Sequence, residues 1–279
     1  MRRLLVALAL MGLVSDALAA DYTAPVLRGS DSFLPATPAY FHWSGFYAGG
    51  QVTYGSGNAD FSSATDPLIA FALRNTTLES TVGVSQWNVL GTADTGAAGF
   101  GGFVGYNTQW DDVVLGLELN YTRSSFNIVA PNNPIALNVT DSDGNFNTLS
   151  SASASMKIED FAVVRARAGW AFNNFLPYAT AGFAVGRADL AVSSTVELQN
   201  TINPIPNPAP ICALAPCVIT SGQTKTSAFL YGYAVGGGLE VALTRNIFAR
   251  GEYEYIQWAP IWQITSHLNM TRLGVGLKF

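Results

Sequence analysis

Eight segments of the chain alternate, at every second residue, between large apolar side chains and glycine, polar or charged ones. This period of two is that of a β-strand, whose successive side chains point to opposite faces of a sheet. In the clearest segment, Val113 to Tyr121, the leucines share one face while Glu118 and Asn120 lie on the other. No long stretch matches the helical spacing of apolar residues. The pattern therefore predicts an all-β fold whose strands each have one apolar face.

The connections between the eight segments differ in length in a regular order. The segments are about 46–54, 98–108, 113–121, 158–172, 177–187, 228–243, 247–255 and 272–279. Tight turns are predicted at 109–112, 173–175 and 244–246, and longer connections at 56–97, 123–157, 188–227 and 257–265. In an antiparallel meander alternate connections lie at the same end, so the short turns gather at one end and the long loops at the other. Bacterial outer-membrane barrels have this arrangement, with periplasmic turns and extracellular loops.

The two faces support a barrel in lipid over a soluble sandwich. A sandwich needs an apolar inner face and a polar outer face, whereas here the face opposite the apolar one mixes glycine with ions. Only 12% of residues are charged, against roughly 25% in a typical soluble domain. We therefore predict an eight-stranded antiparallel up-and-down transmembrane β-barrel, with its apolar face toward lipid and its charged face inward.

Nine charged residues are predicted to line the inside of this barrel. The interior of an eight-stranded barrel is just wide enough to be filled by side chains, and a buried charge is costly unless it is paired. We therefore expect a network of ion pairs in the lumen. Its members are Arg165, Arg167, Arg250, Arg272 and Lys278 on the positive side, and Glu118, Glu240, Glu252 and Glu254 on the negative side.

Aromatic residues near the predicted strand ends fit interfacial girdles, where an amphipathic ring has one wet edge. The alternative for each of them is ordinary core packing. The residues in question are Trp43, Phe46, Tyr54, Trp110, Tyr121, Trp170, Tyr255 and Trp258.

The amino terminus has the composition of a secretory signal. Arg2 and Arg3 precede an apolar run from Leu4 to Val14, and a small-residue cleavage pattern follows. We predict a signal peptide over 1–19, a proline-containing periplasmic leader over 20–44, and the barrel over 45–279. The formal net charge of −5 and the absence of a basic run argue against a nucleic-acid partner.

Few residues suggest chemistry. Cys212 and Cys217 most simply form a disulfide in an oxidising compartment, with a free or metal-binding pair as the alternative. The run from Asp141 to Asn145 resembles the start of a calcium loop but lacks the required glutamate and is interpreted as a turn. His267 is the one candidate for a hydrolytic site, against its interpretation as a polar girdle residue. No cofactor or metal site is predicted, and we expect no enzyme.

Two stretches resemble a known family. Trp43-Ser44-Gly45-Phe46-Tyr47-Ala48-Gly49-Gly50 and the ending Gly274-Val275-Gly276-Leu277-Lys278-Phe279 resemble the first and last strands of the small porin-like outer-membrane proteins of alphaproteobacteria, often called outer-membrane immunogenic proteins. The resemblance implies an eight-stranded barrel with surface-exposed loops and no catalytic motif. It also implies that the terminal aromatic residue, Phe279, is an assembly signal read by the barrel-assembly machinery.

These observations predict a structural, surface-exposed protein of the outer membrane whose loops contact surfaces or ligands. Expected partners are outer-membrane lipid and lipopolysaccharide, and the chain is expected to be a monomer. The alternative is a small porin that passes solutes through the charged lumen, and an outer-membrane hydrolase is a third possibility.

Overall fold

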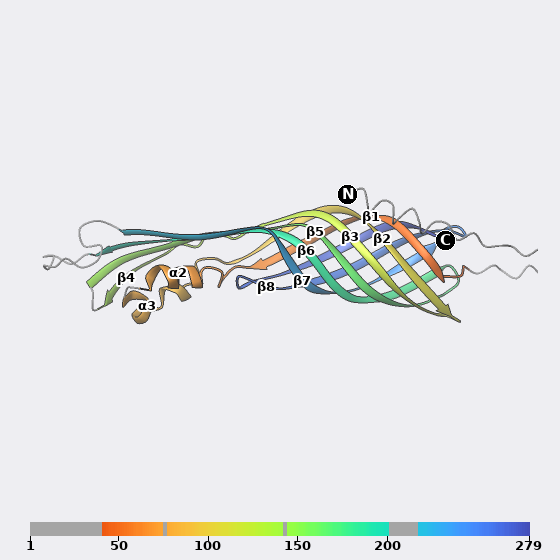
Figure 1. The fold of residues 1–279 in the computed structure, drawn as a ribbon, viewed down its shortest axis with the longest axis horizontal. Coiled ribbons are helices and arrows are strands. Elements are labelled where there is room, and N and C mark those ends of the chain that lie inside the picture. The colour runs from red at the N-terminus through yellow and green to blue at the C-terminus, as the bar shows by residue number, and fades with distance from the viewer. Residues whose placement is uncertain (1–40, 75–76, 142–143, 201–216) are drawn as a thin grey trace, which may run out of the picture. The chain divides into compact units, whose positions relative to one another are not determined.

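The computed structural model of the chain describes residues 41–74, 77–141, 144–200 and 217–279 (Figure 1). The predicted signal peptide, 1–19, lies outside the described residues, as do 20–40 of the predicted leader, 75–76, 142–143 and 201–216. In the described part, no helix is long and apolar enough to cross a bilayer. Most of this part is β-strand.

The strands form one antiparallel sheet that closes on itself. They are β1 (Gly45–Asp60), β2 (Thr92–Trp110), β3 (Val113–Val129), β4 (Ile135–Asp141), β5 (Gly144–Trp170), β6 (Phe175–Asn200), β7 (Cys217–Ala242), β8 (Ile247–Ile261) and β9 (Ile264–Lys278). β1 pairs with β9 and β3 pairs with β5, so eight strands form a ring, and β4 lies outside it in a hairpin with β5. The predicted eight-stranded up-and-down barrel is confirmed.

The predicted faces are also confirmed. Leu117 on β3 is 66% exposed, whereas its neighbour Glu118 is 2% exposed. The same contrast recurs around the ring, where Phe183 of β6 points outward and is 77% exposed. Apolar side chains therefore cover the outside of the ring, and glycine, polar and charged residues face its interior.

The three predicted tight turns join β2 to β3, β5 to β6 and β7 to β8. Asp111 and Asn173 adopt positive φ values of 51° and 53° in the first two, which these short polar residues tolerate. A fourth tight turn was not predicted. β8 and β9 are joined by Trp262 and Gln263 alone, with φ values of 50° and 62°, as in a two-residue hairpin. The longer connection expected over 257–265 is therefore wrong.

Much of the sequence expected as loops is strand. β5 has 27 residues, and β6 and β7 have 26 each, although about 9–11 residues suffice to cross the hydrocarbon. In Figure 1 these three strands continue well beyond the barrel, together with β4. Most of the expected loops over 123–157 and 188–227 thus belong to a sheet that we call the extension. It is formed by β4 and by the parts of β5, β6 and β7 that continue beyond the barrel, which we call their upper parts.

A bulge in β5 changes which of its residues face the interior. The pairing of β5 with β6 shifts between Ile158 and Asp160. Along the chain, even positions such as Met156 face inward before the shift, and odd positions such as Arg165 face inward after it. A bulge adds one residue to one strand and changes which side chains face each side. The bulge therefore keeps an inner face continuous through β5 despite the change of parity.

The connection from β1 to β2 contains helices α2 (Asp66–Leu73) and α3 (Thr77–Val82) and the short helix η2 (Val84–Gln86). A proline in the first turn of α2 favours its start. Ile69 and Leu73 of α2 are buried in one cluster with Val196 and Leu198 of β6. Part of the loop expected over 56–97 therefore packs against the extension.

Candidate functional site: the barrel interior

Arg165 of β5 lies at the centre of the charged interior. Its Nη2 atom lies 2.7 Å from Glu118 Oε1 and 2.6 Å from Glu252 Oε2, and its Nη1 atom lies 2.6 Å from Glu254 Oε1. The guanidinium is 1% exposed. Arginine suits this position because its planar fork donates several hydrogen bonds at fixed angles. One side chain thus joins glutamates of β3 and β8 across the ring.

Arg167 extends the network toward the tight-turn end of the barrel. Its Nη2 atom lies 2.8 Å from Glu240 Oε2, and its Nη1 atom lies 3.4 Å from Glu118 Oε2. It also donates a hydrogen bond of 3.0 Å to the Tyr47 hydroxyl, and its guanidinium lies 4.2 Å from the centre of the Tyr178 ring. Arg167 is therefore held by strands β1, β3, β6 and β7.

Arg250 and Arg272 complete the set of positive charges. Arg250 Nη1 lies 2.9 Å from Glu118 Oε2, while Arg272 lies 3.0 Å from Glu252 Oε1 and 2.5 Å from Glu254 Oε2. All eight side chains in the network are at most 3% exposed, and they are Glu118, Arg165, Arg167, Glu240, Arg250, Glu252, Glu254 and Arg272. Four arginines and four glutamates make the network electrically neutral.

The ninth predicted member, Lys278, lies outside this network. Its Nζ atom donates to the backbone carbonyl of His42 and lies 5.1 Å from the centre of the Phe41 ring. Lys278 is the penultimate residue, at the tight-turn end of β9, where a long side chain reaches the residues that precede β1. The expectation that it pairs with a lumen glutamate is wrong.

Neutral side chains that the sequence did not single out complete the network. The Tyr47 and Tyr178 hydroxyls each donate a hydrogen bond of 2.8 Å, to Glu118 Oε2 and Glu252 Oε2. Arg250 Nη2 donates to Gln51 Oε1 at 2.6 Å, and Gln51 donates to Asn120 Oδ1 at 2.8 Å. Asn120 has the parity of Glu118 on β3, and Tyr47, Gln51 and Tyr178 lie on the faces of β1 and β6 opposite their large apolar residues. That parity is the signal that could have identified them.

Inward glycines leave room for the arginine side chains. A Cβ atom on Gly182 would lie 2.6 Å from Arg165 Cβ, and one on Gly116 would lie 2.2 Å from Asn107 Oδ1 and 3.2 Å from Arg167 Cγ. Such contacts are too short for a side chain. Small residues opposite the arginines therefore allow the strands to pack around the network.

An apolar cluster, the lower cluster, closes the tight-turn end of the interior. It comprises Phe41, Trp43, Tyr47, Phe103, Val114, Ala171, Leu176, Ala242 and Phe248. The backbone N–H of Trp43 donates to Gln109 Oε1 at 2.7 Å, and the ring centres of Trp43 and Phe248 lie 6.2 Å apart. Trp43 is 2% exposed, so its predicted girdle position is wrong, because the chain before β1 turns inward.

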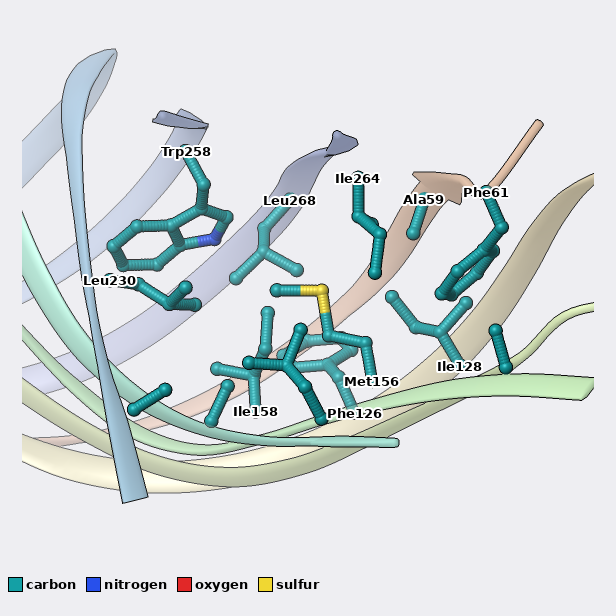
Figure 2. Close-up of a cluster of buried hydrophobic side chains, with 14 of the residues drawn as sticks. Ala59, Phe61, Phe126, Ile128, Met156, Ile158, Leu230, Trp258, Ile264 and Leu268 are labelled. Atoms are coloured by element: carbon teal, nitrogen blue, oxygen red, sulfur yellow. The ribbon is translucent and has the colours of Figure 1, made fainter. Parts of the chain in front are cut away.

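A larger apolar cluster, the upper cluster, fills the interior on the other side of the network (Figure 2). Met156 and Ile158 of β5, Leu230 of β7, Trp258 of β8 and Leu268 of β9 point into it. Trp258 is 1% exposed and has the inward parity of Glu252 and Glu254. Its predicted girdle position is therefore wrong.

Five of the other predicted girdle residues face outward and are exposed by 45–69%: Phe46, Tyr54, Trp110, Tyr121 and Trp170. Tyr255 also has outward parity, and its hydroxyl donates to Gln257 Oε1 at 2.6 Å. These positions fit aromatic rings at the membrane interfaces.

The remaining candidates bring no reactive group together. The His267 ring lies 5.6 Å from the Tyr255 ring, and no described serine or carboxylate forms a hydrogen bond with it in the structure. Among the described residues no cluster could hold a metal ion. Cys212 and part of the Asp141–Asn145 run lie outside the described residues, so the disulfide with Cys217 stays a prediction. The backbone N–H of Phe279 donates to the Phe46 carbonyl at 2.9 Å.

Known proteins are similar in sequence to this chain. Residues 6–279 match the family model of the outer membrane protein β-barrel domain. The chain is 28% identical over 255 residues to a 22 kDa outer membrane protein of Rhizobium leguminosarum bv. viciae, covering 88% of this chain and 82% of that protein. It is 27% identical over 179 residues to the 25 kDa outer-membrane immunogenic protein of Brucella ovis, covering 64% of this chain and 62% of that protein.

Among solved structures, the attachment invasion locus protein Ail of Yersinia pestis aligns over 84% of this chain and 99% of that one, with 13% identity and a TM-score of 0.35. The Brucella relative confirms the family resemblance seen in the sequence. The match to the family model over nearly the whole chain shows that this protein belongs to the outer membrane protein β-barrel family and is a protein of the outer membrane.

Proposed function

We propose that the barrel is closed to solutes and anchors the extension at the cell surface, where the extension and loops make the contacts of this structural, surface-exposed protein. The observation that carries this proposal is the filling of the interior. A neutral network of eight charges lies between the lower and upper clusters, and its members are at most 3% exposed. A conducting path would have to pass both apolar clusters.

The porin alternative is weakened by the pairing of the charges. A selective pore uses charged side chains that face water, whereas these arginines and glutamates are bound to one another at 2.5–3.4 Å. Moving one of them aside would leave its partners buried without a counter-charge, at a cost of several kcal/mol.

Single-channel conductance in a planar bilayer tests the proposal. Protein refolded in detergent, and shown to be folded by its shifted migration when unboiled, is expected to give no steps. The double variant Arg250→Ala/Trp258→Ala, which removes bulk from the network and from the upper cluster, serves as a positive control that is expected to increase leakage. Reproducible steps from the unmodified protein, altered by Arg250→Ala alone, would instead establish a porin.

The expected partners follow from the same arrangement. The outward apolar band contacts outer-membrane lipid and lipopolysaccharide, and the terminal Phe279 is the residue proposed to be read by the barrel-assembly machinery. We also propose that the protein is not an enzyme, since His267 has no described catalytic partner. A hydrolytic activity of whole cells that is lost in His267→Ala but kept in His42→Ala would overturn this.

A further inference from the structure

The outer face of β5 and β6 in the extension carries unusually small side chains. Ser153, Ser155, Ala191 and Ser193 lie there, and with Gly222 of β7 they help to line an open hollow of about 600 Å³. Ser153 pairs with Ser193 across the two strands, and their Oγ atoms lie 2.8 Å apart. This part of the surface can therefore be approached closely by another flat surface.

Charged residues below the hollow occur in opposite pairs on the two strands. Lys157 of β5 lies directly opposite Asp189 of β6, and Asp160 of β5 lies opposite Arg187 of β6 and forms an ion pair with it. The first pair has its positive charge on β5 and the second has it on β6. Glu159, which binds Lys157 on the same strand at 2.8 Å, and Arg123 of β3, which lies opposite Asp160, add one charge of each sign, so the six charges sum to zero. Such a surface does not select an anionic or a cationic partner, but it matches its own copy when a half-turn exchanges the two strands.

The membrane restricts how two copies can meet. Barrels inserted with the same orientation can be related by a twofold axis only if that axis runs along the membrane normal, and a twofold interface uses the same patch on both copies. The upper parts of β5 and β6 run straighter than their lower parts, which wind around the ring (Figure 1). If the axis runs along the strands between two such faces, each β5 residue of one copy lies opposite a β6 residue of the second copy. That β6 residue is the one with which it pairs within a single copy.

We propose that the protein forms a twofold-symmetric dimer through this β5–β6 face. Lys157 meets the partner's Asp189 and Asp189 meets the partner's Lys157, while the serines of the two hollows face each other. The closed barrel proposed above requires only one copy, so this inference goes beyond it. It replaces the monomer expected from the sequence, and a monomer whose hollow contacts lipid or solvent is the competing outcome.

Cross-linking in the native membrane tests the dimer. In a Cys212→Ser/Cys217→Ser background, Ser193→Cys is treated with a short bismaleimide and compared with Ser56→Cys. Ser56 is an exposed serine on β1, across the ring from the β5–β6 face. Ser193→Cys is expected to give a dimer band at least about fivefold stronger than Ser56→Cys, because only the first position lies beside the twofold axis. Equal yields from the two positions would overturn the proposal.

A charge exchange tests the pairing itself. In the Ser193→Cys background, Lys157→Glu places a negative charge opposite the partner's Asp189, and the twofold axis repeats this contact. The variant is therefore expected to lower the dimer yield about threefold or more. Asp189→Lys is expected to act likewise, and the double variant Lys157→Glu/Asp189→Lys is expected to restore the yield. Shifted migration of the unboiled protein checks that each variant is folded. If folded single variants cross-link as well as the parent, the proposed face is wrong.

Discussion

The level of the charged network and the level of the upper cluster are built from the same strands, but their faces carry different side chains. At the network, β5 points Arg165 and Arg167 inward and Val164 outward, whereas beyond the bulge it points Met156 into the upper cluster and Lys157 outward. The inner face of β8 also changes, from buried Glu254 to buried Ile256 and Trp258. On β5, ions therefore lie inside where the outer face is apolar, and apolar residues lie inside where the outer face is polar.

The largest expected effect comes from removing the arginine at the centre of the network. Arg165→Met leaves Glu118, Glu252 and Glu254 without their shared partner, so we expect the free energy of unfolding in lipid vesicles to fall by about 3–5 kcal/mol. Guanidinium titration measures this. Arg165→Lys is the control and should lose less, since lysine keeps the charge but not the fork. If Arg165→Met loses less free energy of unfolding than Met156→Ala, the network contributes less to stability than the upper cluster does.

A somewhat smaller loss is expected in the upper cluster. Met156 is fully buried, and truncating a buried methionine to alanine costs about 2–5 kcal/mol, so Met156→Ala should destabilise the protein by about 3 kcal/mol in the same titration. Ser155→Ala, on the opposite face of the same strand, is the matched control and should leave the midpoint unchanged. Equal effects of the two variants would contradict the assignment of inner and outer faces.

Removing one neutral hydroxyl from the network should have a moderate effect. Tyr47→Phe deletes the donor to Glu118 Oε2 and the acceptor for Arg167, while Arg250 still pairs with Glu118. We expect a loss of about 1–2 kcal/mol, as for a hydrogen bond to a charged group. Tyr54→Phe removes a hydroxyl from the outward face of β1 and should have no measurable effect. If Tyr47→Phe leaves the free energy of unfolding unchanged, the arginines alone provide the hydrogen bonds that Glu118 needs.

The smallest effect is expected for an ion pair on the outside. Lys157 and Glu159 lie 2.8 Å apart, but their side chains are 43% and 49% exposed. Water and salt screen such pairs, so Glu159→Gln should leave the unfolding midpoint unchanged at both low and high salt. A salt-dependent shift as large as that of Tyr47→Phe would remove the distinction between inner and outer charges.

The sequence predicted the inward charges well because parity is a local property. Once Leu117 faces lipid, Glu118 must face inward, and register with the neighbouring strand is not needed for that conclusion. Lys278 shows where this reasoning fails, since parity gives the side of a strand but not its partner at a strand end. Trp258 lies near a predicted strand end, which favours a girdle position, but its parity is inward and the structure buries it.

The extension was missed although its signal is visible in the sequence. Residues 151–158 alternate regularly between polar and apolar side chains, and 190–198 do so over most of their length. Many of these side chains are serine or alanine, and the bulge after Ile158 reverses the parity, so the segments do not continue the pattern of large residues in the barrel strands. The register shift exists only in the pairing of β5 with β6, and no single segment reveals it.

The pairing of β1 with β9 also constrains the order of events during synthesis and insertion. The two strands come from opposite ends of the described chain, and Tyr47 is aligned with Lys278. Until both are present the sheet has two unpaired edges, and every unpaired backbone group that meets hydrocarbon costs several kcal/mol. An open sheet that lacks either strand is therefore excluded from the bilayer interior. Entry into the membrane and closure of the barrel must occur as one process.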